Sequence, residues 1–156
     1  KLSEMNLNGI NLSYADLSGC DLSGACLNRV NLSHANLTNA DLSHSDLSGS
    51  NLRDINLIGA DVSESSLVGA NLVGSDLRSA NLSGVDLRGA DLHDADLMGA
   101  NLSDAMLEGA NLNGVDLSHV DLHNTDLSQC KHTRTISQRI SHYWVTWNGA
   151  EFVQMK

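Results

Sequence analysis

An apolar residue falls at every fifth position of this chain from Leu2 to Leu127. This centre position holds Leu throughout, with Val62 as the lone substitute, and the unit around it reads A-[D/N]-L-x-x, as in Ala70–Gly74. A period of five matches neither the period of about 3.6 of a helix nor the period of about 2 of a plain strand, so the chain must turn a corner in each unit. Gly or Asn at the end of a unit suits such a corner, because these residues tolerate positive φ.

The repeated unit resembles the pentapeptide-repeat family over about four fifths of the chain. The resemblance implies an all-β fold, a right-handed quadrilateral parallel β-helix (a solenoid) with four pentapeptides per coil. Centre and small residues then point inward. Such a coil requires a second period of twenty residues, and the sequence has it: Ser3, Ser23, Ser43, Ser63, Ser83 and Ser103 form one file, Asn11, Asn31, Asn51 and Asn71 another, and Gly49, Gly69, Gly89 and Gly109 a third.

The repeat pattern breaks after Cys130, which divides the chain into a β-helix at 1-130 and a C-terminal cap at 131-156. Ile136, Ile140 and Trp144 have helical spacing, so we expect a short capping helix or an ordered excursion over 131-144. The register then returns, and 145-154 is interpreted as two degenerate repeats that close the last coil with aromatic side chains. The competing interpretation is a longer helix that could form a dimer contact. The predicted cap residues are Trp144, Trp147 and Phe152.

The inward files predict an aliphatic core, since only a few residues of the chain are aromatic. Each buried leucine contributes roughly 1.5 to 3 kcal/mol. The chain has no proline, which would remove a hydrogen-bond donor from a ladder of stacked coils about 4.8 Å apart. The predicted core centres are Leu42, Leu47, Leu52, Leu57, Leu72, Leu77, Leu82 and Leu87.

The repeat body is acidic: up to Cys130 it holds five basic and eighteen acidic residues, within a total net charge of −10. This balance argues against direct binding to nucleic acid or to an anionic membrane. No apolar run approaches the length of about 18 residues that suggests a membrane span. The acidic residues form two files that we take as the candidate interaction surface, Asp21, Asp41 and Asp61 on one wall and Asp76, Asp96 and Asp116 on another.

Two explanations of the acidic files stay open. Asp at this position can hydrogen-bond the neighbouring turn and tolerate the repulsion when solvated. Alternatively, the resemblance implies DNA mimicry, as in the quinolone-resistance members of the family, which present an acidic rod to DNA gyrase. Those members usually have phenylalanine at many centres, where this chain has leucine. A flat serine file also resembles the hydroxyl arrays of ice-binding β-helices, although these usually present threonine.

No residue pattern predicts catalysis, a cofactor or a metal site. An uninterrupted solenoid offers flat walls rather than a pocket, and nucleophile elbows and phosphate loops are absent. Three histidines gather near Asp116 and Asp121 without ligand spacing, and we interpret them as solvated. They are His119, His123 and His132. The cysteines Cys20, Cys26 and Cys130 lack disulfide or zinc spacing and are interpreted as reduced thiols.

The leading hypothesis for function is a non-enzymatic scaffold that binds another protein, in which arginines interrupt the acidic surface and anchor the partner. We expect a bacterial, cytoplasmic protein, or a secreted effector, that could dimerise through its C-terminal end. Gyrase inhibition by mimicry is one alternative. A further alternative is the β-helical binding domain of a larger bacterial effector enzyme, suggested by the start at Lys1 and the basic tail. The candidate anchors are Arg29, Arg53, Arg78 and Arg88.

Overall fold

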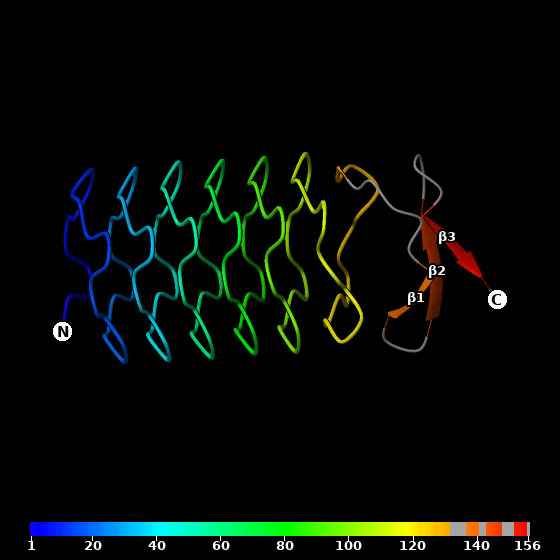
Figure 1. Cartoon of the computed structure of the whole chain (residues 1–156), viewed down its shortest axis with the longest axis horizontal. Helices are drawn as coiled ribbons and strands as arrows, with labels where there is room; N and C mark the ends of the chain where they lie inside the picture. Colours follow the sequence, from blue (N-terminus) through cyan, green and yellow to red (C-terminus); the bar gives the residue numbers. More distant parts are fainter. Residues whose placement is uncertain (132–136, 141–142, 148–151, 156) are drawn as a thin grey trace.

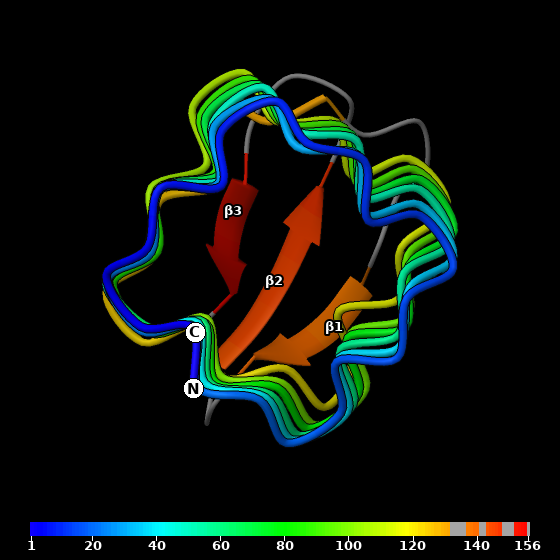
Figure 2. The same cartoon turned by 90° about the vertical axis from the view of Figure 1, so that its left-hand side faces the viewer.

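The computed structural model describes residues 1–131, 137–140, 143–147 and 152–155. Up to residue 131 the chain winds into stacked coils. The residue before a centre pairs in parallel with the residue twenty positions later, as in Asn11↔Asn31 and Asn31↔Asn51, at nearly every level of the described coils. Figure 1 shows the coils following one another along a single axis, and Figure 2 shows them superposed along that axis. Each coil therefore has four units. We number its walls by their first centres: wall 1 from Leu2, wall 2 from Leu7, wall 3 from Leu12 and wall 4 from Leu17.

The unit Ala40–His44 shows how a repeat uses its five backbone amides. The amide of Ala40 closes the preceding turn on the carbonyl of Leu37 at 3.0 Å. Three amides join neighbouring coils: Asp41 donates to the preceding coil at 2.9 Å, and Leu42 and His44 donate to the following coil at 2.7 and 2.9 Å. The fifth amide, of Ser43, donates to the side-chain Oδ1 of Asp41 at 3.0 Å. Every donor of the unit is thus satisfied, as buried backbone requires.

The corner of every unit up to Asn124 has positive φ at the second residue after the centre. Gly49 and Gly89 have φ of 66° and 68° there, but His44 and Asn39 adopt the same conformation at 59° and 56°. A type II turn needs positive φ at its third residue, which glycine provides without strain. The coil imposes this conformation on other residues as well, so the turn is determined by the stacking as much as by the local sequence.

The interior of the coil is a column of leucine and alanine. The eight predicted core centres from Leu42 to Leu87 are all buried, none more than 2% exposed. Inward serines fit because their hydroxyls donate to backbone carbonyls, as Ser45 does to Leu42 at 2.6 Å and Ser50 to Leu27 at 2.8 Å. In the first coil the centres are only partly buried, since they pack against one neighbouring coil. These half-buried centres are Leu2, Leu7, Leu12 and Leu17.

The ladder shifts by one residue at the last coil. In the regular coils a glycine amide such as that of Gly89 donates to the carbonyl nineteen residues later, on Glu108, at 2.9 Å. Gly99 and Gly109 instead donate to carbonyls twenty residues later, on His119 and Gln129, both at 3.0 Å. The shift is local to the turns after walls 4 and 2, because Asp121 and Lys131 pair again with the residues twenty positions earlier.

The chain after the coils forms a small antiparallel sheet, in the order β1-β2-β3. Its strands are β1 (Ser137–Ile140), β2 (Tyr143–Trp147) and β3 (Phe152–Met155). In β1 and β2, Arg139 pairs with Trp144, and between β2 and β3, Trp147 pairs with Phe152.

The prediction of a helix within 131-144 is therefore wrong, as is the longer helix that carried Trp147. The β-branched and aromatic residues of Tyr143–Trp147 favour a strand over a helix. The two degenerate repeats expected at 145-154 are also wrong, because β2 and β3 pair antiparallel rather than as parallel coils. The Asn-Gly pair at 148–149 is a strong hairpin signal that the fivefold register concealed. The prediction that Trp144, Trp147 and Phe152 close the end of the coil concerns their side chains, which lie outside the described part of the structure.

Truncating a core centre in the middle of the rod should destabilise it strongly. We expect Leu72→Ala to lower the free energy of unfolding by about 2–5 kcal/mol, because the coils on both sides hold the cavity open. The measurement is urea denaturation followed by circular dichroism. Leu2→Ala is the control, since Leu2 is only partly buried and its removal leaves no enclosed cavity. Equal losses in the two variants would contradict this account of the core.

Candidate interaction surface

The aspartates of wall 1 are held by the turns that follow them. Oδ1 of Asp41 accepts hydrogen bonds from the amide of Ser43 at 3.0 Å and from its Oγ at 2.6 Å. Asp61 makes the same pair with Ser63, at 3.0 and 2.6 Å. The structure thus supplies the turn-capping role for these carboxylates. Oδ1 of each is thus engaged in the fold.

The three carboxylates of wall 1 lie in register, since Asp21 pairs with Asp41 and Asp41 with Asp61. Like charges about 5 Å apart repel by nearly 1 kcal/mol even in water. Each end of the file has a partner of a different kind, a cationic lysine at Asp21 and a neutral asparagine at Asp61. Nζ of Lys1 lies 3.1 Å from Oδ2 of Asp21, and Nδ2 of Asn81 donates to Oδ1 of Asp61 at 3.0 Å. The acidic file of wall 1 is therefore short and ends at an asparagine.

Wall 4 carries an arginine clamped between aspartates. Nε and Nη2 of Arg78 donate to the two carboxylate oxygens of Asp76 at 2.8 and 2.7 Å, and Nε lies 3.7 Å from Oδ2 of Asp96. These hydrogen bonds hold the pKa of Asp76 below its usual value. Ile58 and Met98 occupy the same file one coil to either side of Arg78, and Met98 is 55% exposed. Asp116, the third predicted aspartate of wall 4, lies in the irregular last coil, where its Oδ1 accepts the amide of Ser118.

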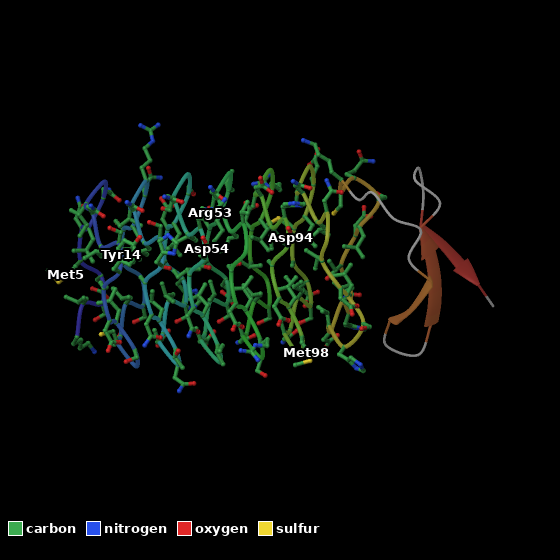
Figure 3. The ribbon with its side chains drawn as sticks, viewed as in Figure 1. Met5, Tyr14, Arg53, Asp54, Asp94 and Met98 are labelled. Carbon is green, nitrogen blue, oxygen red and sulfur yellow. The ribbon has the colours of Figure 1, made fainter. Side chains whose placement is uncertain are left out.

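An aromatic stack on wall 3 was missed by the sequence analysis. The ring of Tyr14, which is 75% exposed, stacks on His34 with centroids 4.8 Å apart and planes at 15°. Next in the file, Oδ2 of Asp54 lies 3.8 Å from Nδ1 of His34 and 3.3 Å from Nε of Arg53. Figure 3 labels Tyr14, Arg53 and Asp54 along the rod. The twenty-residue spacing of Tyr14 and His34 was the available signal, because residues twenty apart are neighbours on a wall.

The remaining predicted anchors, Arg88 and Arg29, both lie on wall 2. Arg88 on wall 2 is bound to Asp86 by Nε at 2.9 Å and by Nη2 at 2.6 Å. Arg29 stands at a turn with φ of 55°. The structure thus distributes the four arginines over walls 2, 3 and 4 and does not bring them into one patch.

No metal centre is found in the described part of the chain, where no group of three or more His, Cys, Asp or Glu side chains is placed to hold an ion. His119 and His123 stand in the last coil and His132 lies outside the described residues. The described residues also contain no helix that is long and apolar enough to cross a membrane.

The three cysteines are free thiols with different access. Cys26 faces outward and is exposed, Cys20 is half-buried, and Cys130 is buried in the last coil. Sγ of Cys130 donates to the carbonyl of Leu107 at 3.2 Å. Burial raises the pKa of the Cys130 thiol to about 12, which keeps it protonated at neutral pH.

Regular coils, one leucine file on each wall and asparagine or aspartate before nearly every centre define this chain as a solenoid of five-residue repeats. A family model described as pentapeptide repeats, in 8 copies, matches residues 1–29, 15–54, 55–94 and 95–131. The chain belongs to the pentapeptide repeat family. No curated protein matches it.

Solved structures of three pentapeptide repeat proteins illustrate the likeness. One from Nostoc PCC 7120 is 39% identical with a TM-score of 0.53, and the match covers 60% of this chain and 84% of that one. HetL, involved in heterocyst differentiation regulation in the cyanobacterium Nostoc sp. PCC 7120, is 27% identical with a TM-score of 0.39, covering 82% and 87%. A protein from the Arabidopsis thaliana thylakoid lumen is 30% identical with a TM-score of 0.43, covering 75% and 71%.

The carboxylates that receive internal hydrogen bonds should make the rod sensitive to acid. The pKa of Asp76 and that of Asp86 lie below their usual 3.8, first because of the arginine hydrogen bonds. A lowered folded pKa contributes stability that is present above the unfolded pKa and lost as pH falls through the folded value. We therefore expect the free energy of unfolding to drop below about pH 4. Urea titrations at a series of pH values measure it, and Asp76→Asn should reduce the slope in that range.

Thiol labelling should distinguish the cysteines. We expect Cys26 to react with a maleimide at neutral pH and Cys130 to react only on unfolding, because it is buried and protonated. Mass spectrometry of peptides after timed labelling reads the two sites separately. Urea-unfolded protein is the control in which both should react. Equal native rates would contradict the burial of Cys130.

Proposed function

We propose that the chain is a non-enzymatic scaffold that binds another protein through the walls of its coil, with wall 4 as the principal binding face. The residue after the centre is serine in many units. The observation that carries the proposal is that wall 4 has Ile58, Arg78 and Met98 at this position, which we call the wall 4 stripe. The corresponding positions of wall 1, at the same levels of the rod, are Ser43, Ser63 and Ser83. The coil itself does not require this difference, because both files are turn positions that face outward.

The composition of the wall 4 stripe supports recognition of a protein. Methionine and arginine are enriched in protein interfaces, and arginine is enriched among the residues that contribute most to binding. Arg78 is already oriented by Asp76 and Asp96, so less side-chain freedom is lost on binding. Each residue of the stripe is followed by a small residue, Gly59, Ser79 or Gly99. These small side chains leave room beside the stripe for a partner to approach.

The rest of the coil also favours binding over catalysis. Most backbone donors and the inward side chains are engaged in holding the coils together, so chemistry would have to come mainly from outward residues on flat walls. The right-handed quadrilateral form of the coil is part of this proposal. It is supported by Figure 2, where the chain, viewed from the N-terminal end, runs clockwise as it recedes.

Substitutions on wall 4 should abolish partner binding without unfolding the rod. The test variant is Arg78→Glu with Met98→Asp, and the control is Ser63→Glu with Ser83→Asp, which adds acidic side chains at matching positions on wall 1. Each purified protein is immobilised and exposed to an extract of its source cells, and retained proteins are identified by mass spectrometry. We expect a partner retained by the native chain and by the control, but lost from the wall 4 variant. Circular dichroism checks that both variants stay folded.

Identical sets of retained proteins on all three would sink the assignment to wall 4. If the partner is lost only from the control, wall 1 is the binding face. Mimicry of DNA is tested separately, by adding the native chain to a gyrase supercoiling reaction. Inhibition at micromolar protein that disappears on Asp41→Asn with Asp61→Asn would support that alternative instead.

A further inference from the structure

A hollow of about 390 Å³ opens on wall 2 where the last coil leaves the regular stack. Its lining includes Arg88, Asp104, Met106, Glu108, Asp126 and Gln129. The hollow lies where the ladder shifts, since the amide of Gly109 donates to the carbonyl of Gln129 instead of that of Ser128. The amide of Leu107, a residue only 2% exposed, has no acceptor within the described residues. An unpaired buried donor therefore lies at this hollow, where a ligand carbonyl could satisfy it.

Met106 departs from the repeat in a way that the fold does not favour. Its position holds Asn or Asp in nearly every unit, because the side-chain oxygen accepts the amide two residues later. Cys26 is another departure on wall 2, and there Oδ1 of Asn8 in the preceding coil accepts the amide of Asn28 at 2.8 Å. In the described part of the chain, no side chain or carbonyl accepts a hydrogen bond from the backbone amide of Glu108 in this way. Met106 instead exposes 46% of its surface at the hollow, and residues that break a local rule tend to be functional.

The charge of the hollow is negative. Both donor groups of Arg88 that form hydrogen bonds are bound to Asp86, which offsets the positive charge of Arg88. In the described residues Asp104, Glu108 and Asp126 form no ion pair with a lysine, arginine or histidine within 4.0 Å. Asp104 and Asp126 accept neutral hydrogen bonds, from Nδ2 of Asn124 at 3.1 Å and from the amide of Ser128 at 2.8 Å. Each keeps a carboxylate oxygen for a ligand.

We propose that this hollow binds a basic peptide segment of a partner protein. The aliphatic stem of an arginine or lysine packs on Met106, and its cationic head lies among the carboxylates of Asp104, Glu108 and Asp126. The peptide backbone accepts a hydrogen bond from the amide of Leu107. Long cationic side chains combine an apolar stem with a charged head, which matches a methionine surrounded by carboxylates. The site is on wall 2, opposite wall 4, so it does not depend on the function proposed for wall 4.

The experiment titrates the full chain, labelled with ¹³C at its methionine methyl groups, with a dodecapeptide of alternating arginine and alanine. The chain has four methionines, and Met5 and Met98, which Figure 3 labels, do not line the hollow and serve as internal references. We expect the methyl signal of Met106 to shift in a saturable manner while those of Met5 and Met98 stay in place. A peptide with glutamate in place of arginine should leave all signals unchanged. Equal shifts of all three would show diffuse attraction to an acidic rod and overturn the proposal.

A pair of charge-matched variants gives the second readout. Asp104→Asn, Glu108→Gln and Asp126→Asn together remove the carboxylates of the hollow but keep the acceptor oxygens that the fold uses. The control, Glu4→Gln, Asp41→Asn and Glu64→Gln, removes the same charge from wall 1. We expect the hollow variant to weaken binding of the arginine peptide about tenfold, since charge-assisted hydrogen bonds are lost, and the control to bind like the native chain.

Equal weakening in the two variants, or no binding by the native chain, would overturn the proposal. Occupation of the hollow by the chain's own basic tail would also overturn it. That outcome is recognised if Arg134→Ala with Arg139→Ala moves the Met106 signal in the absence of peptide.

Discussion

The structure depends on one backbone donor, the amide of the residue that follows each centre. Stacking satisfies three of the five amides of a unit and the turn satisfies a fourth, but the amide of Ser43 points neither up nor down the rod. It is satisfied by the side chain of Asp41. These amides are partly buried or exposed, so an unpaired one costs less than the roughly 1–3 kcal/mol of a buried donor, but the loss would recur in most units. The backbone therefore favours Asn or Asp before the centre, and the acidity of the rod follows in part from this preference.

This preference changes how the acidic surface is understood. A carboxylate and an amide oxygen can both serve as the acceptor, as Asp61 and Asn81 do in adjacent coils, where the amides of Ser63 and Ser83 donate to them at 3.0 and 3.3 Å. Asparagine has the further ability to donate to the preceding coil, as Asn51 does to Asn31 at 3.1 Å. The choice of Asp over Asn thus gives up an inter-coil hydrogen bond and adds repulsion. In return, the carboxylate accepts shorter hydrogen bonds, since Oγ of Ser63 lies 2.6 Å from Asp61 and Oγ of Ser83 lies 2.9 Å from Asn81.

Much of the coil could be predicted because its two periods are exact. The fivefold register predicts that Leu72 points inward, and the separation of twenty residues predicts that Asn31 stacks on Asn51. The clamp on Arg78 could not be predicted, since it depends on the side chain reaching both its own unit and the next coil. The tail was misjudged because the helical spacing of Ile136, Ile140 and Trp144 was weighed above the strand propensity of the same segment. The hollow could not be predicted from the sequence, because it results from a shift of one residue in the hydrogen-bond acceptor of Gly109.

That shift explains why a rod with uniform walls still has distinct places on it. In the regular coils each outward side chain has a neighbour about 4.8 Å above and below, so the walls are closely stacked. At Gly109 the ladder moves by one residue, and the resulting hollow adjoins Met106, the residue that also gives up the capping hydrogen bond. Irregular stacking and an irregular sequence meet at the same point. In a repeat protein such a coincidence is informative, because everything that folding alone demands is already met by the unmodified repeat.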